Sequence, residues 1–248
     1  MPLTAHLAEL RTRLVWSFVA IGVGFVLCYA VSQYLVEYLT RPLVKVLPPG
    51  SSLVFTNLAE AFFAYLKIAF IGGIFLATPV VAYQLWKFVE PGLYEHEKRY
   101  VVPFVLTATV FFVGGALFAY FVAFPVGFRF FMGFASETIR PLPSLKEYLS
   151  FAMKLLLAFG LVFEFPVVTL FLAGLGIVSA RMLRTSRRYA ILLIFILAAL
   201  FTPPDVVSQL IMAVPLYILY ELSILLVALL EKGRALRPSR GTLEEQQG

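Results

Sequence analysis

The chain has 248 residues, of which 61% are hydrophobic and only 14% charged, with a mean hydropathy of +0.91. Soluble domains contain about 45–50% apolar and about 25% charged residues, so this composition excludes an ordinary soluble protein and favours a polytopic membrane protein. The net charge of +6 does not require nucleic-acid binding, because Lys and Arg collect in the cytoplasmic loops of membrane proteins.

Six apolar stretches are interpreted as membrane-spanning helices, since a span needs about 20 apolar residues. In chain order they cover residues 14–36, 67–86, 101–125, 149–173, 189–202 and 206–230. The first is longer than the apolar core of a cleaved signal peptide, and more spans follow it, so we expect it to be retained. The prediction is an all-α integral membrane protein, with a single six-helix domain over residues 1–230 and a polar cytoplasmic tail over 231–248.

The distribution of basic residues predicts the orientation of the chain. Of its 20 Lys and Arg residues, 13 lie before the first span, in the loops after the second and fourth spans, and after the sixth. The loops on the opposite side carry six. Cytoplasmic loops are the ones enriched in Lys and Arg, so both termini are predicted to lie in the cytoplasm.

The fifth span, 189–202, is short. At 1.5 Å per residue it reaches only about 20 Å, against about 30 Å of hydrocarbon. Such a span must thin the bilayer locally or hide its ends in neighbouring protein. Prolines in or beside the spans are expected to bend their helices, and the bent helices either form a concave wall together or reflect ordinary packing irregularity. Small residues such as Gly73 and Ala77 favour close helix approach.

An acidic residue interrupts the fourth span, in the sequence "FGLVFEFPVV" over residues 159–168. Placing the charged side chain of Glu164 at the centre of a bilayer costs about 2.5–3.5 kcal/mol. Lys154 lies about 15 Å away along the same helix and cannot pair with it. Glu164 is therefore either a neutral carboxyl bonded to a neighbouring helix or a polar group that lines a hydrated groove. Glu221, in the sixth span, is a second and weaker case.

Metal and cofactor sites are not expected. Cys28 is the only cysteine, and His6 and His96 are far apart in the sequence, so no set of residues has metal-ligand spacing. No glycine-rich loop of the phosphate-binding type is present, so no ATP site is expected.

Carboxylates also occur on the basic, cytoplasmic side. Glu9 lies in "HLAELRTRL" before the first span, and Glu90, Glu95 and Glu97 lie in the loop "FVEPGLYEHEKRY". A carboxylate binds a guanidinium bidentately, so two such spots could hold two arginines. The alternative is a solvated loop of mixed charge.

Several blocks together resemble the TatC family, the multispanning receptor subunit of the twin-arginine protein translocase. They are "HLAELR" at 6–11, "FVEPGLYEHEKR" at 88–99, "FAYFVAFP" at 118–125, "FGLVFEFP" at 159–166 and "TPPDVVSQ" at 202–209. The resemblance runs in order over residues 3–230. It implies a concave, glove-like array of six helices, in which spans five and six are short.

The resemblance also implies roles for individual residues. In the family, the N-terminal segment and the first cytoplasmic loop recognise the paired arginines of the signal peptide, which assigns this recognition to Glu9 and Glu97. The same patch is expected to contain Arg11, Phe88, Pro91, Leu93, Tyr94 and Arg99. Glu164 matches an intramembrane glutamate that faces the concave groove. Thr202 and Gln209 match positions in contact with partner helices, whereas Pro42 and Asp205 match extracytoplasmic loop positions.

The function implied by the resemblance is that of a twin-arginine signal-peptide receptor and core translocase subunit. It would export folded proteins across the bacterial cytoplasmic (inner) membrane, driven by the protonmotive force, without acting as an enzyme. The expected partners are TatA- and TatB-type single-span proteins, twin-arginine signal peptides, the lipid bilayer and further copies of the chain, but no nucleic acid.

Two other functional classes are considered. A proton-coupled secondary transporter would use Glu164 as its substrate site, and it would move solute in liposomes without any partner. An intramembrane hydrolase would need a Ser–His pair or two aspartates within the spans. Both histidines lie outside the spans and Asp205 is the only aspartate, so a hydrolase is disfavoured.

Overall fold

The computed structural model describes residues 3–48, 51–55, 57–92, 101–136, 141–202 and 205–235. Helices dominate these residues and none of them belongs to a β-strand, although Val54 and Ser144 form an isolated parallel bridge. The predicted all-α class is therefore confirmed. The chain forms two compact units, Met1–Val162 and Phe163–Gly248, and each is described by itself.

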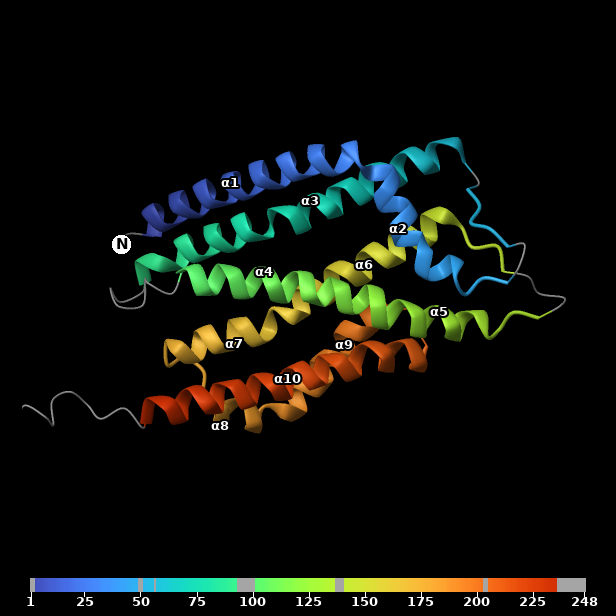
Figure 1. Cartoon of the computed structure of the whole chain (residues 1–248). Helices are drawn as coiled ribbons and strands as arrows, with labels where there is room; N and C mark the ends of the chain where they lie inside the picture. The colour runs from blue at the N-terminus through green and yellow to red at the C-terminus, as the bar shows by residue number, and fades with distance from the viewer. Residues whose placement is uncertain are drawn as a thin grey trace, which may run out of the picture. The chain divides into compact units, whose positions relative to one another are not determined.

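The first unit contains most of the helical length of the chain (Figure 1). Its elements are α1 (Leu3–Ala30), α2 (Ser32–Val44), α3 (Leu58–Val89), the 3₁₀ turn η1 (Glu90–Gly92), α4 (Val101–Phe118), the π-helical turn η3 (Ala119–Ala123), α5 (Phe124–Met132) and α6 (Leu145–Phe163), whose last residue reaches the second unit.

The beginning of the chain differs from the pattern expected from hydropathy. The apolar stretch 14–36 is divided between α1 and α2, which meet at Val31. Residues 37–44, expected in a loop, continue α2 because Leu39 and Leu43 bury one side of it. Pro42 accordingly lies buried inside a helix.

Two tyrosine hydroxyls, one buried and one partly exposed, bond α2 to the rest of the first unit. The Tyr148 hydroxyl of α6 donates to the carbonyl of Leu39 at 2.5 Å, and the Tyr120 hydroxyl of η3 donates to the carbonyl of Tyr38 at 2.7 Å. The rings of Tyr38 and Tyr120 stack with centroids 4.8 Å apart. Their bodies are apolar and their hydroxyls satisfied, so these tyrosines stabilise the packing of α2.

The second unit is built from α7 (Phe165–Gly174), α8 (Ala180–Thr185), α9 (Arg187–Phe201) and α10 (Val206–Ala235). With 15 residues, α9 is about 22 Å long, which agrees with a short fifth span. The sixth span was expected to be short as well, and this is wrong: α10 has 30 residues and reaches about 45 Å.

The helix α10 also includes residues 231–235, which were expected to begin the polar tail. A tertiary contact explains the extension, because Oε1 of Glu231 accepts the backbone N–H of Ala180, at the start of α8, at 3.0 Å. Lys232 is in addition favourably placed near the negative end of the helix dipole. The rest of the predicted tail, 236–248, lies outside the described residues.

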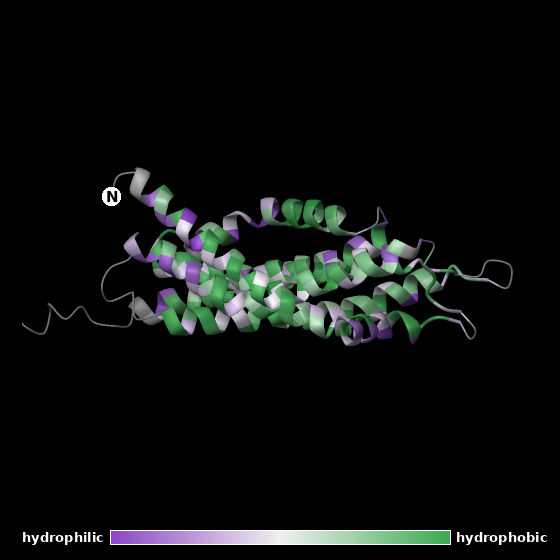
Figure 2. Cartoon of the chain, turned by 90° about the horizontal axis from the view of Figure 1, so that it is seen from above, coloured by the Kyte–Doolittle hydropathy of each residue, from purple (hydrophilic) through white to green (hydrophobic). Residues whose placement is uncertain are grey.

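Five helical segments in the described part of the chain are long and apolar enough to cross a membrane. They are His6–Ala30, Ala59–Val89, Val101–Met132, Leu145–Gly174 and Val206–Gly233. In the most apolar window of the first, only 6% is buried, so its hydrophobic surface is available to lipid. Hydrophobic residues run through the middle of the helices, and hydrophilic ones lie mainly toward their ends (Figure 2).

Two glycines set the distance between α1 and α3. A Cβ atom built on Gly24 would lie 2.7 Å from the carbonyl oxygen of Gly73, and one built on Gly73 would lie 2.6 Å from the backbone nitrogen of Phe25. Contacts this short leave no room for any side chain, so the two backbones touch directly at this crossing. The small face predicted around Gly73 is therefore a true close approach.

Candidate functional site

The N-terminal part of α1 and the C-terminal part of α3 meet on a surface that we call the α1–α3 end surface, comprising His6, Glu9, Arg13, Gln84 and Phe88. The rings of His6 and Phe88 stack with centroids 4.4 Å apart. Nη1 of Arg13 reaches Oε1 of Gln84 at 3.5 Å. These contacts place the "HLAELR" segment against α3, so two of the predicted motifs come together here.

Glu9 is an ion-paired carboxylate on this surface. Its Oε1 lies 3.1 Å from Nη2 of Arg13, and the side chains of Arg13 and Glu9 are 30% and 22% exposed. Within the described part of the chain, Oε2 of Glu9 accepts no hydrogen bond. The pairing was readable in the sequence, because residues four apart face each other on a helix. With respect to the residues that the structure describes, Glu9 therefore has one carboxylate oxygen available, and its side chain is only partly covered.

The other predicted members of this patch have different outcomes. Phe88 is half-buried against His6, whereas Arg11 and Pro91 are exposed. Glu90 begins η1 and pairs with Lys87 at 2.7 Å, so its charge is already matched. Leu93, Tyr94, Glu97 and Arg99, together with Glu95, lie outside the described residues, and their roles stay predictions.

Glu164 stands at a break between two helices. It separates α6 from α7, and Pro166 follows within the first turn of α7. Proline has no N–H to continue the helical ladder, which accounts for the interruption, although Val168 still donates to the carbonyl of Glu164 at 2.9 Å. The side chain is half-buried and has no hydrogen-bond or ion-pair partner among the described residues. The carboxylate does not cap α7 either. The alternative of a neutral carboxyl hydrogen-bonded to a neighbouring helix therefore has no support among the described residues.

Glu221, the second intramembrane candidate, has partners within its own unit. Its carboxylate pairs with Arg187 at the start of α9 at 2.7 Å and accepts the Tyr217 hydroxyl at 3.0 Å. Nearby, the Tyr220 hydroxyl donates to the carbonyl of Leu183 in α8 at 2.6 Å. The Glu221 ion pair joins α9 to α10, and the Tyr220 bond joins α8 to α10, so the carboxylate of Glu221 already has partners within the second unit.

The link between α9 and α10 carries three predicted residues. Oδ1 of Asp205 accepts the backbone N–H of Ser208 at 2.7 Å, which makes Asp205 the N-cap of α10. The Thr202 hydroxyl donates to the carbonyl of Ala198 at 2.8 Å. The side-chain amide of Gln209 is half-buried and makes no hydrogen bond to any described residue.

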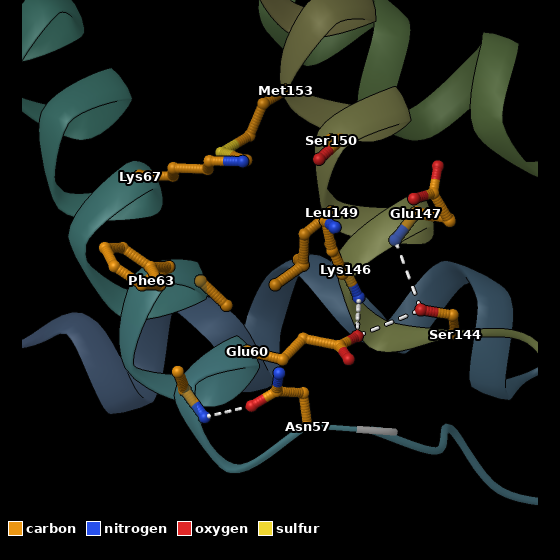
Figure 3. A pocket seen from close by; sticks show the side chains of 12 residues that line it. Asn57, Glu60, Phe63, Lys67, Ser144, Lys146, Glu147, Leu149, Ser150 and Met153 are labelled. Carbon is orange, nitrogen blue, oxygen red and sulfur yellow. Dashed lines mark hydrogen bonds between the residues drawn. The ribbon is translucent and has the colours of Figure 1, made fainter.

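Sequence reasoning missed a buried carboxylate, Glu60, near the start of α3. It is 7% exposed, and its Oε1 accepts both the Ser144 hydroxyl and the backbone N–H of Lys146, each at 2.9 Å (Figure 3). The signal was present in "NLAE" over residues 57–60, a capping pattern in which Asn57 caps α3. The acid of this pattern caps a different helix, α6, 85 residues further on.

Glu60 lies in a polar pocket of about 700 Å³ at the N-terminal ends of α3 and α6, shown in Figure 3. Two acids and two lysines line it: Glu60, Glu147, Lys67 and Lys146. Its charge is therefore balanced. Among the described residues no group of His, Cys, Asp or Glu side chains could hold a metal ion.

Comparison with known proteins identifies relatives over most of the chain. Residues 5–215 match the family model of the Sec-independent protein translocase protein (TatC). Proteins named TatC are similar in Desulforapulum autotrophicum (55% identity, covering 90% of this chain and 83% of the relative) and in Escherichia coli K12 (40% identity, covering 90% and 86%). A crystal structure titled "Twin Arginine Translocase Receptor- TatC" superposes with a TM-score of 0.82 at 39% identity, covering 90% of this chain and 98% of that one.

Proposed function

Because the chain belongs to the TatC family, and is therefore a multi-pass membrane subunit of the Sec-independent translocase and not an enzyme, we propose that it is the receptor for twin-arginine signal peptides. One observation carries the proposal: Glu9 presents a half-covered carboxylate on a surface where α1 and α3 meet. In this proposal both termini lie in the cytoplasm of a bacterial cell, so that the α1–α3 end surface faces newly made precursors.

Glu9 can accept a further guanidinium without losing Arg13. The Glu9–Arg13 pair is partly buried and uses one carboxylate oxygen, Oε1. A hydrogen bond to a charged partner contributes about 1.5–3 kcal/mol, and Oε2 can accept such a bond from a signal-peptide arginine. We assign the second arginine to Glu97 and the surrounding contacts to Arg11, Phe88, Pro91, Leu93, Tyr94 and Arg99. A lysine cannot form the same two-pronged bond, which supports discrimination of Arg-Arg from Lys-Lys.

Replacing Glu9 with alanine is expected to weaken binding of a twin-arginine signal peptide about tenfold or more, because one charge-assisted bond is lost. Fluorescence anisotropy with labelled Arg-Arg and Lys-Lys peptides measures the effect on the purified protein. Glu37→Ala is a matched control, since Glu37 and Arg41 form an i,i+4 pair with the same 3.1 Å separation on α2. If Glu9→Ala and Glu37→Ala both discriminate the peptides as the parent does, Glu9 is not the arginine site.

We further propose that Glu164 is a polar contact inside the membrane for a signal peptide or partner helix. Its lack of a partner among the described residues supports this assignment. The chain would work with TatA- and TatB-type proteins, with Thr202 and Gln209 at the contact, and with further copies of itself. The free amide of Gln209 supports a contact of this kind, and the 15-residue α9 supports local thinning of the bilayer there. The driving force would be the protonmotive force.

Glu164→Gln is expected to reduce export of a twin-arginine reporter severalfold while leaving the protein as abundant in the membrane as the parent. Glutamine keeps the shape of the side chain and removes its charge, so a packing role would survive the change. Export into the periplasm and membrane abundance are measured on the same cells. Export at the parent level would show that ionisation of Glu164 is dispensable.

A further inference from the structure

A second hollow lies beside the charge-balanced pocket of the first unit, and its lining is different. This groove has a volume of about 490 Å³, within the range of about 300–1,000 Å³ of small-molecule sites. Phe25 of α1, Phe70 of α3 and Leu157 of α6 give it apolar walls, and Lys67 and Lys154 supply its charge. No Asp or Glu is among the residues that line it. The groove is thus mostly apolar, and its charged side chains are two lysines: Lys67, which also lines the pocket of Glu60, and Lys154, which lines this groove alone.

The two lysines lie at the same level of the molecule. Each follows the first residue of its helix, Leu58 or Leu145, by nine residues, or about 14 Å. The N-terminal ends of these helices are joined by the bonds from Glu60 to Ser144 and Lys146, so the two levels coincide. Lys67 extends from α3 toward Ser150 and Met153 of α6 (Figure 3). Both lysines therefore line the same groove at the same level.

This level lies just inside the hydrocarbon of a bilayer, within reach of its headgroups. The 32 residues of α3 span about 48 Å, which exceeds the hydrocarbon thickness of about 30 Å by about 9 Å at each end. The Cα atoms of Lys67 and Lys154 would then lie about 5 Å inside the hydrocarbon, and their long side chains reach the phosphates by snorkelling. Both lysines are exposed, and within the described part of the chain neither makes an ion pair or hydrogen bond.

We propose that this groove binds one anionic phospholipid from the leaflet at the N-terminal ends of α3 and α6, with its phosphate between Lys67 and Lys154 and an acyl chain along Phe25, Phe70 and Leu157. Charge complementarity selects the occupant. A free inorganic anion would leave the apolar walls without a contact, and a zwitterionic lipid would leave one positive charge without a partner. The proposal is independent of the receptor function and of the orientation of the chain.

The test is native mass spectrometry of the full-length protein in detergent, titrated with phosphatidylglycerol or with phosphatidylcholine of identical acyl chains. We expect the parent to prefer phosphatidylglycerol. Each lysine near a membrane surface strengthens attraction to anionic lipid about fivefold, so Lys67→Gln with Lys154→Gln should lose about 25-fold in affinity. Lys146→Gln is the matched control, because Lys146 is on α6 but lines only the charge-balanced pocket. Lys67→Arg with Lys154→Arg should restore binding.

Each other outcome overturns the proposal. Equal binding of the two lipids, or unchanged binding by the double glutamine variant, would show that the lysines do not select a phosphate. Displacement of the lipid by millimolar inorganic phosphate at constant ionic strength would identify a simple anion site. Displacement by a signal peptide at equimolar concentration would assign the groove to a peptide. Melting curves of all variants without added lipid establish that the glutamine substitutions leave the fold intact.

Discussion

Replacing Gly24 with leucine is expected to force α1 away from α3 and to lower the melting temperature of the purified protein by roughly 6–12 °C. Any Cβ at this position meets the backbone of Gly73, which cannot rotate away as a side chain would. Overpacking a protein interior lowers the free energy of unfolding by about 1–3 kcal/mol. Because the neighbour here is rigid backbone, we expect a loss near the upper end of this range. For a chain of this size, about 1 kcal/mol corresponds to about 2–4 °C.

Gly22 provides the matched control for this experiment. It lies on the same helix, two residues away, is exposed, and has nothing within 4 Å of a Cβ built on it. Gly22→Leu should leave the melting temperature unchanged or raise it slightly, because leucine is the better helix former. Gly72→Ala should give an intermediate loss, since its Cβ would meet side-chain atoms and no backbone: the thiol of Cys28 at 2.9 Å, Cβ of Cys28 at 3.3 Å and a methyl of Leu35 at 3.5 Å. Equal melting temperatures for the Gly22 and Gly24 variants would contradict the backbone contact.

Glu60→Ala is expected to destabilise the first unit by about 2–4 kcal/mol. The substitution removes the shared acceptor of two donors, the Ser144 hydroxyl and the Lys146 amide, and a part-buried hydrogen bond to a charged group contributes about 1.5–3 kcal/mol. It also removes a negative charge from the positive N-terminal end of α6, at about 0.3–1 kcal/mol. Thermal unfolding in detergent measures the loss of stability, and hydrogen exchange at the Lys146 amide measures the loss of its hydrogen bond.

Two variants separate the contribution of the hydrogen bonds of Glu60 from that of its charge and from a general effect of removing an acid. Glu60→Gln keeps an oxygen acceptor and removes only the charge, so it should lose less than Glu60→Ala. Glu147→Ala removes an exposed acid that lines the same pocket and should change stability by less than about 0.5 kcal/mol. If Glu60→Ala unfolds at the parent temperature with unchanged exchange at Lys146, the cap on α6 does not contribute to stability.

The parts of the fold that could be predicted are those written in consecutive residues. Long apolar runs identified the helices, and the count of residues in the fifth run predicted a short α9. The same reasoning failed at the ends of runs. Hydropathy did not separate α1 from α2, and it ended the last helix at residue 230, whereas α10 continues to Ala235. The contacts that decide both ends, the burial of Leu39 and Leu43 and the bond from the Ala180 amide to Glu231, are tertiary.

The candidate site shows the same division. Motifs placed Glu9 and Phe88 on one functional surface, and the stack of His6 on Phe88 brings their segments together in space. The four-residue spacing of Glu9 and Arg13 on a helix is typical of the ion pair that they form. Glu221 resembled Glu164 as an acid in an apolar run, yet only the structure showed that Arg187, 34 residues earlier, neutralises it.

The sequence by itself determined the class of protein, the positions of its apolar helices and its family, because hydropathy and motifs depend on neighbouring residues along the chain. Tertiary structure alone decided which buried charges have partners, where two backbones touch at Gly24 and Gly73, and that Lys67 and Lys154 share one groove. The reason is physical: each of these contacts joins residues dozens of positions apart, and their approach is set by how whole helices pack against one another.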